Sequence, residues 1–407
     1  MKISASFLAL LLSATWPATV PAAQDRPDDS DLDGIVRQLT SRKRPAATAE
    51  FASRAQAEPA PDTCGMSPAL LTTKRGSDSK SFQVALQSRA VAAATEVLLV
   101  RPSRLTVDAD GAARAYHPED PLAECAGGND GHHACALDNV ANAGMRLFRG
   151  GERLKASWAA PLDEARLDFE RSWRDIWQLM KDRKLKPFRL SNVVGPDGPK
   201  GYNLFHWSER NLTLALKTEI VPQTKDGYPC MAAGNGSLGY FISATTLTLP
   251  SRARKDGCRP QRFVDSERIP FVVLPAERLG GVALGDIVVG VLKLEDDYRI
   301  VFGIAGDTGS FDRFGEASIA FNAALLGRST PPAGGREVDR LDIKAPGGGY
   351  IALLAFGGTS RLVGKQLSAE RIARIGSKIF SEWNVGNNLR GGRLERCLST
   401  AGFLDDD

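Results

Sequence analysis

The sequence predicts a mainly β protein with added helices, an α+β chain whose strands close into a barrel. Its 40 glycines and 23 prolines among 407 residues favour many turns over a helical bundle. Short apolar, β-branched runs bounded by Gly, Pro or Asp recur through the second half of the chain. So many short strands in one stretch are typical of a closed barrel or a sandwich.

The expected strands follow one another along the chain from residue 96. Most are short apolar runs, and the segment at 212–216 alternates apolar and polar residues as a half-buried strand does. They are expected at 96–100, 105–107, 212–216, 239–243, 269–275, 286–292, 298–304 and 350–356.

Two helices are expected outside the strands. Apolar residues recur at helical spacing over 162–180, between Pro161 and Pro187. A second helix is expected from the N-cap Ser368 through Phe380.

Composition and charge exclude several classes of protein. Hydrophobic residues make up 43% of the chain and charged residues 25%, as in ordinary globular proteins. A net charge of +4 is too small to mark a nucleic-acid-binding surface, so no nucleic-acid partner is expected. No membrane span is expected in the mature chain, since only the first residues hold a long apolar run. A monomer is expected.

The first 62 residues are expected to precede the folded domain. Lys2, the apolar run at 7–12 and the small residues before Gln24 are typical of a secretory signal peptide over residues 1–23. Residues 24–62 are rich in Asp, Arg, Ala and Pro, which predicts a disordered linker. The folded domain is expected over residues 63–400, in a secreted or periplasmic protein.

Six cysteines, an even number, suit an exported protein that forms disulfides. Two pairs are close in sequence, and the third pair would tie the two ends of the domain together. The expected bridges are Cys125–Cys135, Cys230–Cys258 and Cys64–Cys397. The chain has no Cys-x-x-Cys, which argues against a zinc or thioredoxin-type site, and no metal is expected.

Two common catalytic motifs are not met. Residues 235–239 carry Asn where the nucleophile elbow Gly-x-Ser-x-Gly needs its first Gly. Residues 364–366 lack the Ser or Thr that follows the lysine of a phosphate-binding loop. The adjacent His132 and His133 are interpreted as part of a solvated loop rather than a metal site.

One segment, residues 303–320, carries a pair of acidic residues in an unusual setting. Asp307 ends an apolar strand and Glu316 opens the next apolar element, while Gly306 and Gly309 allow close approach of the backbone to a ligand. Glycoside hydrolysis needs such a pair: one carboxyl protonates the leaving oxygen, and the other activates water or attacks the sugar. The acid needs a raised pKa. A polar β-turn with an aspartate cap is the alternative interpretation.

This segment resembles glycoside hydrolase family 75, the fungal-type chitosanases and their bacterial relatives. In that family a strand ends in Gly-x-x-Gly-Asp-Thr, and Gly-Glu-Ala-Ser-Ile follows after a loop; residues 303–308 and 315–319 match both. Weaker matches include an Asp-x-Asp-Gly segment, a Ser-Thr-Thr strand and a Pro-Tyr-Val-Val-Leu-Pro run. They lie at 107–111 with 115–116, at 239–247 and at 263–275, and the likeness runs discontinuously from about residue 97 to 397.

The resemblance implies that residues 63–400 are a catalytic domain. The implied activity is that of an endo-acting chitosanase, which cleaves β-1,4-glucosaminide bonds with inversion and without a cofactor. The catalytic residues it implies are Asp307 and Glu316. The substrate-binding residues are Asp108, Asp110, Tyr116, Thr245 and Thr308. Asp108 and Asp110 would attract the ammonium groups of glucosamine; a plain Asp-Gly turn is the alternative.

Two other functions are left open. Residues 305–310 are also similar to the Asp-Thr-Gly turn of the barrel domain in A-type lytic transglycosylases. That likeness implies a six-stranded double-psi barrel and a peptidoglycan substrate, with Asp307 as a single acid. The other alternative is a non-catalytic envelope protein that binds a glycan or a partner. The helix with Trp158, Trp173 and Trp177 would then be an interaction surface.

Overall fold

The structure is a computed structural model. It describes residues 64–75, 78–116, 122, 145–150, 152–154, 164–188, 202–232, 240–250, 258–294, 298–309, 314–334, 337–338, 340–347, 349–364, 367–385 and 392–399. The expected signal peptide, the expected linker and the expected Cys125–Cys135 bridge lie outside these residues. Within them, no helix combines the length and the apolar character needed to cross a membrane.

Ten of the described strands form one mixed sheet, which confirms the mainly β class with added helices. Its strand order is β1-β2-β3-β19-β15-β16-β12-β17-β4-β18. The bounds are β1 Ser67–Arg75, β2 Asp78–Val91, β3 Ala94–Val100, β4 Arg104–Asp108, β12 Phe271–Leu274, β15 Ile287–Lys293, β16 Tyr298–Thr308, β17 Glu316–Ser318, β18 Ile343–Lys344 and β19 Tyr350–Gly357.

The expected closed barrel, and with it the double-psi form, is wrong. Among the described strands, β1 and β18 end the large sheet without pairing with each other, and none of the three smaller sheets closes. The reason lies in β1 and β2, which form an antiparallel pair from Ser67 opposite Leu86 to Arg75 opposite Asp78. β2 occupies the edge of β3 that a closing strand would need. β1 and β2 are largely polar, and their apolar runs are too short to predict strands from the sequence.

A row of paired residues across four strands brings the segments of the site together. β12 pairs in parallel with β16, with Val273 opposite Asp307. On its other side β12 pairs with β17, where Val272 is opposite Ala317. β17 in turn pairs in parallel with β4, which places Ser318 opposite Asp108. The ends of β4 and β16 therefore lie on the same part of the sheet, although about 200 residues separate them in sequence.

Helix α4, Ile319–Leu325, packs on one face of the sheet. Ser318 caps it by accepting a hydrogen bond from the N–H of Phe321. The ring of Phe321 occupies space that two glycines on neighbouring strands leave open. A Cβ at Gly290 would lie 2.4 Å from that ring and one at Gly303 2.8 Å from it. Because β17 runs directly into α4, this packing fixes the position of β17 on the sheet.

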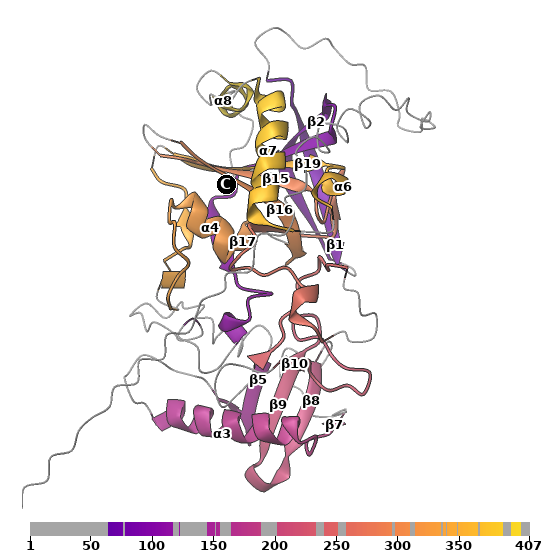
Figure 1. Ribbon diagram of the computed structural model, residues 1–407, viewed down its shortest axis with the longest axis vertical. Helices are drawn as coiled ribbons and strands as arrows, with labels where there is room; N and C mark the ends of the chain where they lie inside the picture. The colour runs from indigo at the N-terminus through magenta and orange to yellow at the C-terminus, as the bar shows by residue number, and fades with distance from the viewer. Residues whose placement is uncertain are drawn as a thin grey trace, which may run out of the picture. The chain divides into compact units, whose positions relative to one another are not determined.

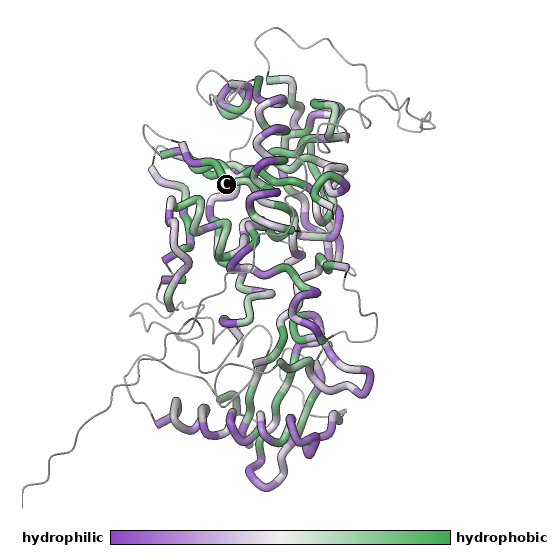
Figure 2. Tube along the Cα trace, in the orientation of Figure 1, coloured by the Kyte–Doolittle hydropathy of each residue, from purple (hydrophilic) through white to green (hydrophobic). Residues whose placement is uncertain are grey.

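Helix α7, Ala369–Asn384, packs on the opposite face and confirms the helix expected from Ser368 (Figure 1). Ser368 caps it through the N–H of Arg371. Gly376 of α7 lies against Phe302 of β16, whereas the next residue, Gly303, faces α4. Successive residues of a strand face opposite sides, so the two helices cover opposite faces of the sheet. The indole N–H of Trp383 donates to Oε1 of Gln87 on β2 at 2.9 Å. Figure 2 shows mostly hydrophobic residues along β15, β16 and β19, the strands between the two helices.

A second, five-stranded sheet with the order β6-β5-β9-β8-β7 was not expected as a unit. Its strands are β5 Met145–Arg149, β6 Glu152–Leu154, β7 Pro187–Phe188, β8 Tyr202–Trp207 and β9 Leu212–Lys217. The expected strand at 212–216 is thus confirmed as β9. The first expected helix is confirmed as α3, Glu164–Lys181, in which Trp177 packs edge-on against Phe241 at 5.2 Å between ring centroids.

The two expected disulfides that fall in described residues are confirmed. Cys230 pairs with Cys258, and Cys64 pairs with Cys397, which ties the start of the described chain to α8, Arg393–Ser399. The described cysteines are all paired. Further short elements are β11 Tyr240–Phe241, α6 Ser360–Val363 and the turn of 3-10 helix at Arg114–Tyr116.

Candidate active site

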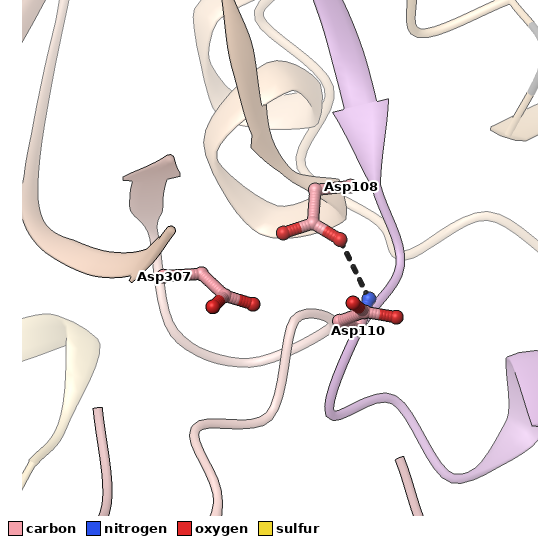
Figure 3. Close-up of side chains that lie close together, drawn as sticks. All are labelled: Asp108, Asp110 and Asp307. Carbon is pink, nitrogen blue, oxygen red and sulfur yellow. Dashed lines mark hydrogen bonds between the residues drawn. The ribbon is translucent and has the colours of Figure 1, made fainter. Parts of the chain in front are cut away.

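The first acidic segment of the site is a tight turn at the end of β4. Asp108 is the last residue of the strand, and its Oδ1 accepts the backbone N–H of Asp110 at 2.8 Å (Figure 3). Gly111 follows with a φ of +83°, and a Cβ there would lie only 1.9 Å from the carbonyl oxygen of Val264. Only glycine fits this position. Gly111 therefore allows the tight turn that places Asp108 and Asp110 close together.

Two hydroxyl groups hold the second aspartate of the turn. The hydroxyl of Tyr116 donates to Oδ1 of Asp110, and the hydroxyl of Ser243 donates to the same oxygen at 3.1 Å. Ser243 also accepts the N–H of Gly111 at 3.2 Å. Tyr116 is completely buried and Ser243 is 5% exposed. Asp110 is therefore anchored from the protein interior.

The third aspartate comes from the other side of the site, near the end of β16. Asp307 is 5% exposed, and its Oδ1 accepts three hydrogen bonds. The backbone N–H and the hydroxyl of Thr246 donate to it at 2.8 and 2.7 Å, and the N–H of Thr308 donates at 2.7 Å. These donors hold one oxygen of the carboxyl, and in Figure 3 the side chain points toward the other two aspartates.

Asp108, Asp110 and Asp307 form a compact acidic group. One carboxylate oxygen from each lies within 4.8 Å of those of the other two. Oxygen ligands of this kind suit hard cations. However, the buried polar atoms without a partner in the described residues belong to Gln223 and Asn322, outside this group. The acidic cluster alone therefore assigns no cation.

Burial and mutual repulsion raise the pKa of each aspartate. For Asp110, burial is the larger cause and the charge of Asp307 adds to it, which raises its pKa to about 7. Burial, then the charges of Asp110 and Asp307, raise the pKa of Asp108 well above its ordinary value. Burial also raises the pKa of Asp307, against the effect of its three donors. Near neutral pH the group therefore retains at least part of a proton.

Glu316 lies beside this group rather than in it. It opens β17 opposite Thr106, two positions before the pair formed by Ser318 and Asp108. Its charge contributes to the raised pKa of Asp108. A Cβ at Gly309, just past the end of β16, would lie 2.8 Å from Oε2 of Glu316. Glu316 thus lies between the strand of Asp108 and the segment that follows Asp307.

The other residues expected to bind substrate have different surroundings. Tyr116 holds Asp110 and is too buried to touch a ligand. Thr245 is 2% exposed, and its hydroxyl donates to the carbonyl of Leu247 and accepts the N–H of Val264. Thr245 therefore joins two backbone segments, and the role expected of it does not fit. Thr308 is half-buried at the edge of the acidic group.

Sequence reasoning missed two residues of the site, Thr246 and Ser243. Both belong to the Ser-Ala-Thr-Thr run that the family resemblance brought to notice. Adjacent residues of an extended segment face opposite sides. Thr246 therefore faces Asp307, whereas Thr245 faces the core. The sequence alone did not indicate which of the two threonines belongs to the site.

No protein-family model matches the sequence, and no curated protein shows significant similarity to it.

Proposed function

We propose that this protein is a polysaccharide hydrolase of the glycoside hydrolase family 75 type, with chitosan as its substrate. The observation that carries the proposal is the convergence of four acidic residues from β4 and the turn that follows it, β16 and β17. Three have raised pKa values, so proton-holding and proton-accepting carboxyl groups can coexist near neutral pH. This is the chemical requirement of glycoside hydrolysis.

The proposed catalytic pair is Asp307 and Glu316. One carboxylate oxygen from each of the three aspartates lies within 4.8 Å of those of the other two, which is closer than the about 6.5–9.5 Å between the carboxyl groups of inverting pairs. Glu316 lies outside that group, which suits a base acting on water from the far side of the sugar. Asp307 suits the acid because burial raises its pKa.

The proposed reaction balances two proton transfers. Asp307 gives its proton to the glycosidic oxygen, which leaves with the electron pair of the broken bond. Water adds to the anomeric carbon from the opposite face and loses a proton to Glu316, so the configuration inverts. Solvent then returns both carboxyl groups to their starting states. With a pKa of about 7, Asp110 carries a negative charge in part of the molecules near neutral pH, and a negative charge there favours a cationic polymer such as chitosan.

The proposed location is secreted or periplasmic, and the proposed working form is a monomer. Two disulfides support export, because disulfides form and persist in oxidising compartments.

The deciding experiment is reducing-sugar release from soluble chitosan by purified, oxidised protein. Release by the wild type, lost in both Asp307→Asn and Glu316→Gln, supports the proposal. Asp226→Asn, at an exposed ion pair with Arg183, is the matched control and should retain full activity. Circular dichroism on each variant separates loss of chemistry from loss of folding.

A folded wild type that releases nothing from chitosan overturns the proposed substrate. Peptidoglycan sacculi are then the next polymer: anhydro-sugar ends would indicate lyase chemistry, and reducing ends would indicate hydrolysis. Binding to either polymer without product would indicate a non-catalytic binding protein.

A further inference from the structure

Thr246 contacts Asp307 through two groups at once. Its backbone N–H and its hydroxyl both donate to Oδ1, and Thr308 adds a third donor to that oxygen. A carboxylate has about four lone-pair sites shared by its two oxygens. With three donors on Oδ1, a proton on this carboxyl is confined to Oδ2.

The direction of the hydrogen bonds around Thr246 follows from counting hydrogens. A threonine hydroxyl has one hydrogen, and that of Thr246 is donated to Asp307. The 2.7 Å contact between the hydroxyls of Thr246 and Thr308 must then be donated by Thr308. The hydroxyl groups form a chain from Thr308 through Thr246 to Asp307, and each bond in such a chain polarises the next. Thr308 can offer a substrate only an acceptor.

We propose that Thr246 is a positioning residue for the proposed hydrolysis. It holds Oδ1 of Asp307 so that Oδ2 faces the other carboxyl groups and the substrate. The inference rests on the proposed function, in which Asp307 is the acid. Thr246 is exposed, whereas the aspartate that it holds is only 5% exposed.

The kinetic test is Thr246→Val, which preserves the branched shape and the backbone N–H but removes the hydroxyl. The expected result is a fall in kcat of about 10- to 100-fold with little change in KM, the scale of a hydrogen bond to the carboxylate that Asp307 becomes as it gives up its proton. Thr246→Ser restores the hydroxyl and should recover most of the loss. Thr248→Val is the matched control: Thr248 is exposed two residues further along and is not among the described donors to Asp307, so kcat should not change.

An unchanged kcat in Thr246→Val, or a loss that Thr246→Ser does not recover, overturns the inference. Crystal structures of the wild type and of Thr246→Val provide a readout that needs no activity. The carboxyl of Asp307 should rotate in the variant, and an unmoved carboxyl also overturns the inference. If the wild type cleaves no glycan, the proposed function fails, while these structures still decide whether Thr246 positions Asp307.

Discussion

Tyr116 donates its hydroxyl hydrogen to Oδ1 of Asp110 from a completely buried position. Burial, together with the charge of Asp110, raises the pKa of Tyr116, so this hydroxyl stays a donor at any pH of interest. The hydrogen bond stabilises the ionised form of Asp110 and opposes the rise in its pKa. A completely buried residue thereby influences the protonation of an aspartate in the acidic group.

Tyr116→Phe should therefore raise the pKa of Asp110 above its value of about 7. The loss of one hydroxyl donor should raise the pKa of the Asp110 carboxyl by about one pH unit, since a hydrogen bond to a carboxylate contributes on the order of 1.5 kcal/mol. Carbon-detected NMR titration of the aspartate carboxyl groups measures the shift. Tyr228→Phe, whose hydroxyl donates to a distant backbone carbonyl, is the control, and an unmoved Asp110 titration in Tyr116→Phe would contradict the prediction.

Asp110 should also make the protein less stable as the pH rises. Its pKa is about 7 in the folded state against an ordinary value of 3.8, so between these pH values the folded state binds more protons than the unfolded state. Stability therefore falls as the pH rises from about 4 to about 7. Asp110→Asn keeps an acceptor for Tyr116 and removes the charge, and should stabilise the protein at pH 8 by up to about 4 kcal/mol.

Urea unfolding of Asp110→Asn and the wild type at pH 5 and pH 8 measures this effect. The gain should be largest at pH 8 and less than half as large at pH 5, because at pH 5 the folded protein still holds the proton of Asp110. An equal gain at both values would mean that the charge of Asp110 is not its source. Asp226→Asn, at an exposed site, should show no such pH dependence.

Gly290→Ala should destabilise the protein by about 1–3 kcal/mol, because the added Cβ would lie 2.4 Å from the ring of Phe321. Gly347→Ala is the matched control, since a Cβ there meets no atom within 4 Å. Urea unfolding measures both variants. Combining Gly290→Ala with Phe321→Leu should recover part of the loss, and strict additivity of the two changes would exclude a clash between them.

Removing the Cys64–Cys397 disulfide should cost more stability than removing Cys230–Cys258. The two bridges span 333 and 28 residues, and in the chain-entropy view the longer loop constrains the unfolded chain more. Paired Cys→Ser variants should lose about 2–5 kcal/mol, with the larger loss at Cys64–Cys397. Urea unfolding under oxidising conditions measures the losses, and the reverse order would show that native packing around each bridge dominates.

The local pattern of the sequence predicted individual elements better than their assembly. Periodicity located α3 and α7, and apolar runs located β12, β15, β16 and β19. Sheet closure depends on which edges are occupied, and the pair β1–β2 that occupies the edge of β3 has only short apolar runs within a largely polar sequence. The barrel prediction therefore failed because it located these strands correctly but assumed that the two edges of the sheet pair with each other.

In the candidate site, too, the sequence predicted the local motifs but not how they come together. Asp307 and Glu316 were found because both stand in one short segment, and the Asp108–Gly111 turn was found as a separate motif. That the two motifs meet follows from the pairing of β17 with β4, a contact between residues about 200 positions apart. The role of Tyr116 as an anchor depends on its complete burial, which its short sequence context did not indicate.

The pairing of β4 also sets an order of events during synthesis. In the described sheet its strand neighbours are β17 and β18, which begin at Glu316 and Ile343. Asp108 and Asp110 therefore have no strand to dock on until more than three quarters of the chain has left the ribosome. The close repulsive charges of the acidic group therefore come together only after β17 has been synthesised.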